Sequence, residues 1–290
     1  MDYLDRVAEA LQFIEDNIRS DMELTAVAES AGCSLFYFHR IFAALTGDTL
    51  KEYIRKRRMT LAANELVASR RRIIEIAVDY GFASQEAFTR SFKQHFGLTP
   101  ARFRKNGLCY EIRAPRDLAQ LQQNLHLRSG KMEPVIVEKP EFVVIGKQIA
   151  TTPDGQNFKE IPMFWQRYMQ EKTSQKIPNK VTPWKEYGIC ADGDENSRCF
   201  IYMIGAEVSS TAEIPAGMVA RRIPASTYAV FTSKGPMPEA IQEVWKYIYG
   251  TWLPGQTRYI RTNTEDFELY DERCLKTVPE VDIYVPIKPR

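Results

Sequence analysis

The feature that most constrains the fold is a helix, glycine, serine, helix pattern that occurs twice, about fifty residues apart. In the first copy a short apolar helix is expected to end at Gly32, and Ser34 is expected to cap the next helix. In the second copy Gly81 and Ser84 take these two positions. Two short helices joined by a tight turn that contains glycine form a helix-turn-helix unit. The sequence therefore predicts two such units within residues 1–107.

The second helix of the first unit is predicted to bury one side and project the other. Its apolar stripe consists of Leu35, Phe38, Ile41, Phe42 and Leu45. Phe36, His39 and Arg40 fall on the opposite side and are expected to be exposed, where Arg suits guanine and Phe suits a thymine methyl group. The alternative is a surface helix that carries an incidental charge. Thr25 is the expected cap of the preceding helix.

The second unit repeats this arrangement with a clearer stripe, in which Phe88, Phe92 and Phe96 recur every four residues. The residues predicted to face bases are Gln85, Glu86, Thr89 and Arg90. Glu86 has two interpretations, because it can accept a hydrogen bond from cytosine or pair with Arg90 one helical turn away.

A basic helix is predicted over residues 50–67, between the two units. From Arg40 to Gly107 there are 14 Lys and Arg against 6 Asp and Glu, a net charge of +8, whereas residues 1–39 hold 2 against 8, a net charge of −6. Such a block suits a polyanion, although composition alone also allows a solvated charged face. Lys56 and the helix N-termini at Ser34 and Ser84 are the expected phosphate contacts.

Two motifs in this region resemble the AraC/XylS-type DNA-binding domain. They are Leu24-x2-Val27-Ala28-x3-Gly32-x-Ser34 and Ile76-Ala77-x3-Gly81-Phe82-x-Ser84-x3-Phe88-x3-Phe92-Lys93. The resemblance covers about 100 residues and implies a seven-helix, double helix-turn-helix domain that binds double-stranded DNA. It also implies activation of transcription through contact with RNA polymerase.

The chain changes character after Gly107. Residues 108–131 are interpreted as a linker with some helix at 118–125, and a second, α+β domain is expected over residues 132–290. Its strand-like and helix-like runs follow the order strand, helix, strand, strand, and this order occurs twice. Such a repeat predicts two β-α-β-β halves around a central cleft.

Glu268 is the candidate ligand-binding residue of this second domain. Strand alternation places Glu268 and Tyr270 on one face and Phe267 and Leu269 on the other. A carboxylate among aromatic rings suits a cation with apolar bulk. From the spacing alone, an exposed strand acid and ordinary aromatic core residues are the alternatives.

Several motifs here resemble the GyrI-like effector-binding domain. They include Phe200-Ile-Tyr202-x2-Gly205, Trp245-x3-Tyr249-x2-Trp252, Phe267-Glu268-x-Tyr270 and Ile283-Tyr-Val-Pro286. The resemblance implies that a cleft takes bulky, often cationic or amphipathic compounds, with an acidic residue at the position of Glu268. Trp165, Tyr187 and Tyr270 are the expected companions of that residue.

The two resemblances together indicate a transcription regulator that senses a small molecule such as a drug, and not an enzyme. Three alternatives stay open: a hydrolase of electrophilic compounds, a protein-binding module similar to gyrase inhibitors, and a relic pocket. No cofactor or metal is expected.

The sequence has neither a signal-peptide pattern nor an apolar run of membrane-spanning length, so a cytoplasmic protein is expected. The five scattered cysteines are interpreted as reduced thiols, with a sensor as the alternative.

Overall fold

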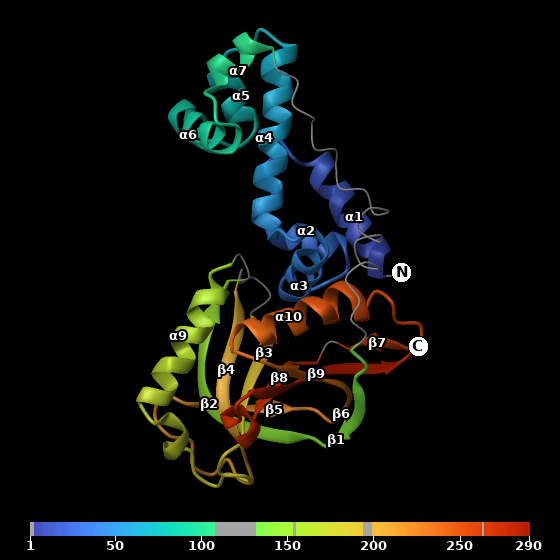
Figure 1. Ribbon diagram of the computed structural model, residues 1–290, viewed down its shortest axis with the longest axis vertical. Coiled ribbons are helices and arrows are strands. Elements are labelled where there is room, and N and C mark those ends of the chain that lie inside the picture. The colour runs from blue at the N-terminus through green and yellow to red at the C-terminus, as the bar shows by residue number, and fades with distance from the viewer. Residues whose placement is uncertain (1–2, 108–131, 153–154, 194–198, 263) are drawn as a thin grey trace. The chain divides into compact units, whose positions relative to one another are not determined.

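The computed structural model describes residues 3–107, 132–152, 155–193, 199–262 and 264–290 (Figure 1). The chain divides into two compact units, Met1–Asn124 and Leu125–Arg290, called here unit 1 and unit 2. The predicted linker, with its helix at 118–125, lies outside the described residues, as does Cys109. The other four cysteines, Cys33, Cys190, Cys199 and Cys274, are free thiols.

Unit 1 is all-helical over the described residues. Its helices are α1 (Tyr3–Asp16), α2 (Leu24–Ser30), α3 (Leu35–Thr46), α4 (Leu50–Ala68), α5 (Ile73–Asp79), α6 (Gln85–Phe96) and α7 (Pro100–Asn106). The long helix α4 runs between the group α1–α3 and the group α5–α7 (Figure 1). The seven predicted helices of the double helix-turn-helix fold are therefore present.

Serine side chains cap α3 and α6, the second helices of the two helix-turn-helix units, as expected. Ser34 accepts a hydrogen bond from the backbone N–H of Tyr37 at 3.4 Å, and Ser84 accepts one from Ala87 at 3.1 Å. The prediction for Thr25 was wrong, because α2 begins one residue earlier at Leu24 and places Thr25 inside the helix. The cap position belongs to Glu23, whose side chain makes no capping hydrogen bond there.

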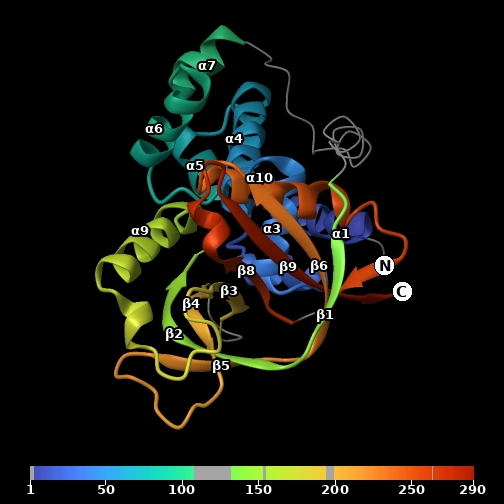
Figure 2. The same cartoon turned by 60° about the horizontal axis from the view of Figure 1, so that its bottom comes forward.

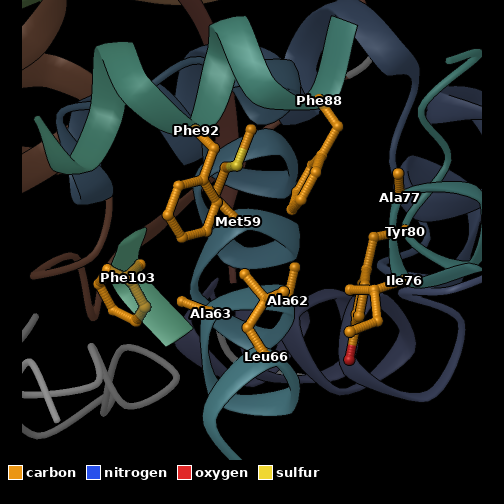
Figure 3. Packing of buried hydrophobic residues seen from close by; sticks show 10 residues of the cluster. All are labelled: Met59, Ala62, Ala63, Leu66, Ile76, Ala77, Tyr80, Phe88, Phe92 and Phe103. Atoms are coloured by element: carbon orange, nitrogen blue, oxygen red, sulfur yellow. The ribbon is translucent and has the colours of Figure 1, made fainter. Parts of the chain in front are cut away.

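A phenylalanine-rich core holds α4 to α5, α6 and α7 (Figure 3). Phe88 and Phe92 of α6 are fully buried, and the ring of Phe92 packs edge-on against Phe103 of α7 with centroids 5.2 Å apart. Tyr80 and residues of α4 such as Leu66 close the same core. The stripe of phenylalanines predicted for α6 therefore points into the interior of unit 1.

The described residues of unit 2 form a nine-stranded antiparallel sheet, strongly curved in Figure 2. Its strands are β1 (Val135–Lys139), β2 (Phe142–Thr151), β3 (Glu186–Asp192), β4 (Phe200–Val208), β5 (Val219–Ile223), β6 (Ser226–Lys234), β7 (Tyr259–Arg261), β8 (Asp266–Tyr270) and β9 (Glu280–Pro289). The strand order is β1-β6-β9-β8-β3-β4-β2-β5, with β7 beside β9.

This order describes two equivalent halves that meet at the pairing of β3 with β8. Outward from that pair, one side continues β4, β2, β5 and the other continues β9, β6, β1. The predicted strand, helix, strand, strand repeat is thus confirmed as β2-α9-β3-β4 and β6-α10-β8-β9. The short strands β1 and β5 were not predicted, and each pairs with the half to which it does not belong in sequence.

Two helices pack on the sheet, α9 (Asn157–Gln170) and α10 (Glu239–Tyr247), the second continuing as a π-helical turn over Ile248–Trp252. Helix α9 begins at Asn157 and carries Pro162 inside. Pro162 is the sixth residue of the helix and has no backbone N–H, so it cannot donate the intrahelical hydrogen bond to the carbonyl oxygen of Phe158. No helix among the described residues is long and apolar enough to span a membrane.

We expect Phe92→Ala to lower the free energy of unfolding of unit 1 by about 3–5 kcal/mol, because it removes a fully buried ring from the core. Hydrogen exchange should show faster exchange of the amides of α4–α7 and unchanged exchange in the sheet of unit 2. Lys93→Ala, at the exposed neighbouring position, is the control and should change stability by no more than about 0.5 kcal/mol. Equal exchange in the two variants would contradict this account of the core.

Candidate functional site

Glu268 lies on β8 as a buried carboxylate with three hydrogen-bond donors. Its side chain is only 6% exposed. Oε1 accepts from the indole N–H of Trp245 at 2.7 Å, and Oε2 accepts from the hydroxyls of Tyr202 and Tyr270, each at 2.9 Å. These donors replace the water that a buried carboxylate would lose, which is the condition for burying it at all. The expectation of an exposed strand acid does not hold for Glu268.

The three donors come from β4, β8 and α10. Tyr202 lies on β4 and in turn accepts a hydrogen bond from the indole N–H of Trp165 on α9 at 2.9 Å. The ring of Trp165 also contacts that of Tyr270, with centroids 4.4 Å apart. Trp245 lies on α10 and stacks on Tyr249 at 5.7 Å. Both helices therefore lie over the same face of the sheet, and each contributes one tryptophan to the surroundings of the carboxylate.

Glu268 also lies at the junction of the two halves, directly opposite Gly188 of β3 in the strand register. A Cβ atom at position 188 would lie 2.4 Å from the Tyr202 hydroxyl and 3.0 Å from Oε2 of Glu268. Any larger residue would fill the space that the hydroxyl and the carboxylate occupy. Gly188 therefore makes room for the Tyr202–Glu268 hydrogen bond.

Matching contacts in the two halves of unit 2 show that Gly188 and Glu268 occupy the same position of the repeat. The hydroxyl of Tyr168 on α9 donates to Glu186, the first residue of β3, at 2.7 Å. The hydroxyl of Tyr249, after α10, donates to Asp266, the first residue of β8, also at 2.7 Å. Gly188 and Glu268 each lie two residues beyond these acids. One half of the repeat thus supplies the carboxylate and the other half supplies the space for it.

The charge of Glu268 is not neutralised within the described residues, since no Lys or Arg of that part of the chain forms an ion pair with it. Asp266, by contrast, pairs with Arg261 at 3.0 Å, and Glu186 pairs with Lys180 at 3.1 Å. Burial, and then the nearby charge of Glu268, raise the pKa of both Tyr202 and Tyr270 well above the ordinary tyrosine value. Both hydroxyls therefore stay protonated as donors at neutral pH.

The structure corrects the expectation for Tyr187, which lies on the opposite face of the sheet from Glu268. Tyr187 pairs with Leu269, and successive residues of a strand point to opposite faces. Its hydroxyl donates to Glu207 at 2.6 Å, and its ring packs with Phe142 and Phe267 in an apolar core. Of the four predicted ligand residues, the structure thus brings together Glu268, Trp165 and Tyr270 and leaves Tyr187 apart.

Two residues of the site were missed in the sequence, Tyr202 and Trp245. Both belong to the motifs that carry the GyrI-like resemblance, but the sequence alone also allows both as ordinary core aromatics. Strand alternation alone cannot select Tyr202, because the pairing of β4 with β3 decides which of its residues approach Glu268.

In unit 1, helix α6 presents a polar face as predicted. Gln85, Glu86 and Arg90 are exposed, and Thr89 is half-buried. The backbone N–H of Glu86 itself and the Ser84 hydroxyl hold the pKa of the Glu86 carboxyl below its usual value, with a smaller contribution from Arg90. Glu86 is therefore ionised at the N-terminal end of the helix, and the charge of Arg90 favours that state.

Helix α3 differs from this pattern, and the expected exposure of two of its residues was wrong. Phe36 is 7% exposed and His39 is 3% exposed, whereas Arg40 is half-buried. The guanidinium carbon of Arg40 lies 4.4 Å from the centre of the Phe36 ring, so the arginine covers part of the phenyl group. Nine of the twelve residues of α3 are aliphatic, Phe or Tyr, so the apolar surface of this helix extends beyond the predicted stripe.

The predicted phosphate contacts have partners within the protein. Lys56 forms an ion pair with Asp48 at 2.5 Å and keeps a third of its side chain exposed. The hydroxyls of Ser34 and Ser84 are the helix caps described above. Among the described residues no group of His, Cys, Asp and Glu is arranged to hold a metal ion.

A double helix-turn-helix unit followed by a sheet that buries a carboxylate among aromatic donors defines a DNA-binding regulator with an effector-binding domain. Comparison with known families agrees with both parts. Residues 27–106 match the family described as a helix-turn-helix domain, and residues 135–287, more than half of the chain, match Cass2, described as an integron-associated effector binding protein. The chain belongs to the AraC-type transcription regulators and carries a Cass2-type, GyrI-like effector-binding domain.

Individual relatives match different parts of the chain. The multiple antibiotic resistance protein MarA of Escherichia coli is 40% identical over 103 residues, 36% of this chain and 81% of that protein. The transcriptional regulator BrlR of Pseudomonas aeruginosa is 35% identical over 179 residues, 59% of this chain and 63% of BrlR. The right origin-binding protein of E. coli is 26% identical over 273 residues, 93% of this chain and 91% of that protein. Among solved structures, SAV2435 bound to tetraphenylphosphonium has a TM-score of 0.48 and 21% identity, covering 54% of this chain and 94% of that chain.

We expect Gly188→Ala to disrupt the hydrogen bonds of Glu268 and to lower the free energy of unfolding of unit 2 by about 1–3 kcal/mol, because its methyl group would overlap the buried Tyr202 hydroxyl. The measurement is thermal unfolding together with the emission of the tryptophans near the carboxylate. Tyr187→Phe, which alters only the opposite face, is the control and should leave that emission unchanged. An unaltered emission spectrum in Gly188→Ala would contradict the arrangement described here.

Proposed function

We propose that this regulator activates transcription when a bulky organic cation binds beside Glu268 in unit 2. The observation that carries the proposal is a buried carboxylate whose partners are all neutral. Trp245, Tyr202 and Tyr270 satisfy its hydrogen bonds but leave its negative charge in place. A cation is the ligand that this charge would favour most.

The aromatic residues add selectivity for the shape of the cation. Trp165 and Tyr270 lie in contact beside the carboxylate, and Trp245 covers it from α10. Indole and phenol rings attract cations through their negative faces and bury the apolar groups that such cations carry. A delocalised cation with aromatic substituents fits this chemistry better than a small, strongly hydrated one.

On the DNA side, we propose that α6 reads bases with Gln85, Glu86, Thr89 and Arg90. The exposure of this face supports the assignment. For α3 we retain Arg40 as a base contact, with Phe36 and His39 beside it, on the resemblance to AraC-type domains. Lys56 and the helix N-termini at Ser34 and Ser84 would contact phosphates.

We propose further that the protein acts in the cytoplasm and contacts RNA polymerase, as its AraC-type unit suggests. A catalytic role is not favoured, because the relative BrlR is a transcriptional regulator. Binding of the cation would influence transcription only through a difference in its affinity for two arrangements of the protein.

Glu268→Gln tests the effector site. We expect this variant to bind tetraphenylphosphonium at least about tenfold more weakly, which is about 1.4 kcal/mol, while neutral triphenylphosphine oxide binds it as it binds the parent. Titration calorimetry on the full chain measures both affinities. Glu207→Gln, which removes a carboxylate from the opposite face of the sheet, is the matched control. If Glu268→Gln bound the cation as tightly as the parent, Glu268 would not belong to the site.

Arg90→Ala tests the base-reading face. We expect it to cost about 1–3 kcal/mol on the cognate duplex and to relax the preference at one base pair. Lys93→Ala, on the same exposed helix, should instead weaken binding to all sequences alike. The measurement compares dissociation constants for cognate and random duplexes at one salt concentration. An unchanged ratio of these constants in Arg90→Ala would exclude Arg90 as a base contact.

A further inference from the structure

Arg58, in the middle of α4, links the segment after α1 to the rest of unit 1. Its Nε donates to the carbonyl oxygen of Ile18 at 2.8 Å, and its Nη2 donates to that of Ser20 at 2.6 Å. Both bonds use the planar fork of the guanidinium, which holds its orientation better than an ammonium group would. The side chain of Arg58 is therefore held in one position by the backbone of the segment between α1 and α2, which leads into the first helix-turn-helix unit.

The same guanidinium lies against the turn of the second helix-turn-helix unit. Gly81, between α5 and α6, has φ of +77°, and a Cβ atom there would lie 2.7 Å from Nη1 of Arg58. The positive φ angle and the close contact both favour glycine at this position. Arg58, on the connecting helix α4, thus contacts both the segment that leads into the first helix-turn-helix unit and the turn of the second.

A second link runs parallel to the first. Nη2 of Arg19, in the segment after α1, donates to Glu65 of α4 at 3.1 Å and to the hydroxyl of Tyr80 at 3.0 Å. The Tyr80 hydroxyl donates to the same oxygen of Glu65 at 3.1 Å, and Tyr80 is 2% exposed. Tyr80 ends α5 and immediately precedes Gly81. We call these four residues, Arg19, Arg58, Glu65 and Tyr80, the brace.

We propose that the brace fixes the orientation of α6 relative to the first helix-turn-helix unit and thereby sets the spacing of the two half-sites that the protein accepts on DNA. Arg58 is the principal positioning residue. This inference rests on the proposed DNA binding of unit 1. A reading helix reaches base edges only in the correct rotational phase of the groove, so an orientation held by hydrogen bonds becomes a preference for one spacing.

Arg58→Gln tests the inference on duplexes that carry both half-sites at the cognate spacing or with one or two base pairs inserted. We expect the parent to prefer the cognate spacing by about tenfold or more, and Arg58→Gln to reduce that preference to about threefold or less. Arg55→Gln removes the same charge from an exposed position of the same helix. It should lower affinity for all spacings equally. An undiminished spacing preference in Arg58→Gln would overturn the proposal.

A distance measurement tests the brace without DNA. Spin labels are introduced through non-natural amino acids at two exposed positions, Glu29 on α2 and Gln94 on α6. They report the distance between the two helix-turn-helix units in the full chain. We expect a single narrow distance distribution in the parent and in Arg55→Gln, and a broader one in Arg58→Gln. Equal widths in all three proteins would overturn the brace. A parent with a narrow distribution but without preference for any DNA sequence would instead overturn the proposed function.

Tyr80→Phe keeps the inference testable if Arg58→Gln does not fold. It retains the buried ring and removes only the hydroxyl that bonds to Arg19 and Glu65. We expect it to lower the spacing preference by about two- to threefold with little change in melting temperature. A spacing preference equal to that of the parent would count against the second link of the brace.

Discussion

The direct pairing of Gly188 with Glu268 is the constraint on which the proposed effector site depends. The two halves of unit 2 meet at β3 and β8, so a residue of one half faces its own equivalent at the junction. Two carboxylates there would repel each other, whereas two glycines would leave no charge. One of each places a single carboxylate at the centre of the sheet, with space beside it for the Tyr202 hydroxyl.

The carboxylates on the two faces of the sheet have different kinds of partner. On one face, the hydrogen-bond partners of Glu268 are neutral indole and phenol donors. On the other, Tyr187 donates to Glu207, which also lies 4.0 Å from the Lys139 ammonium, above an apolar core. The first arrangement favours a cationic ligand, and the second is already neutralised by the protein's own lysine.

Unit 1 shows a similar divergence between duplicated parts. Helices α3 and α6 share a serine cap and a left-handed glycine at the end, yet α6 exposes a polar face and α3 is largely buried. The two helices differ in composition, because nine of the twelve residues of α3 are aliphatic, Phe or Tyr. Helix α4 is not all that connects the two helix-turn-helix units. Arg58 of α4 contacts both the segment after α1 and Gly81, and Arg19 of that segment bonds to Tyr80.

The sequence by itself determined what depends on near neighbours in the chain. The positions of glycine and serine located both helix-turn-helix units, and the spacing of the phenylalanines identified the buried side of α6. Alternation along β8 placed Glu268 on the same face as Tyr270. Tertiary structure alone decided which distant strands pair. That pairing revealed β1 and β5, moved Tyr187 to the opposite face and brought Tyr202 to the carboxylate, and the packing of α10 on the sheet brought Trp245 there. Periodicity records the side of an element on which a residue lies, but the register between distant elements depends on packing that no local pattern contains.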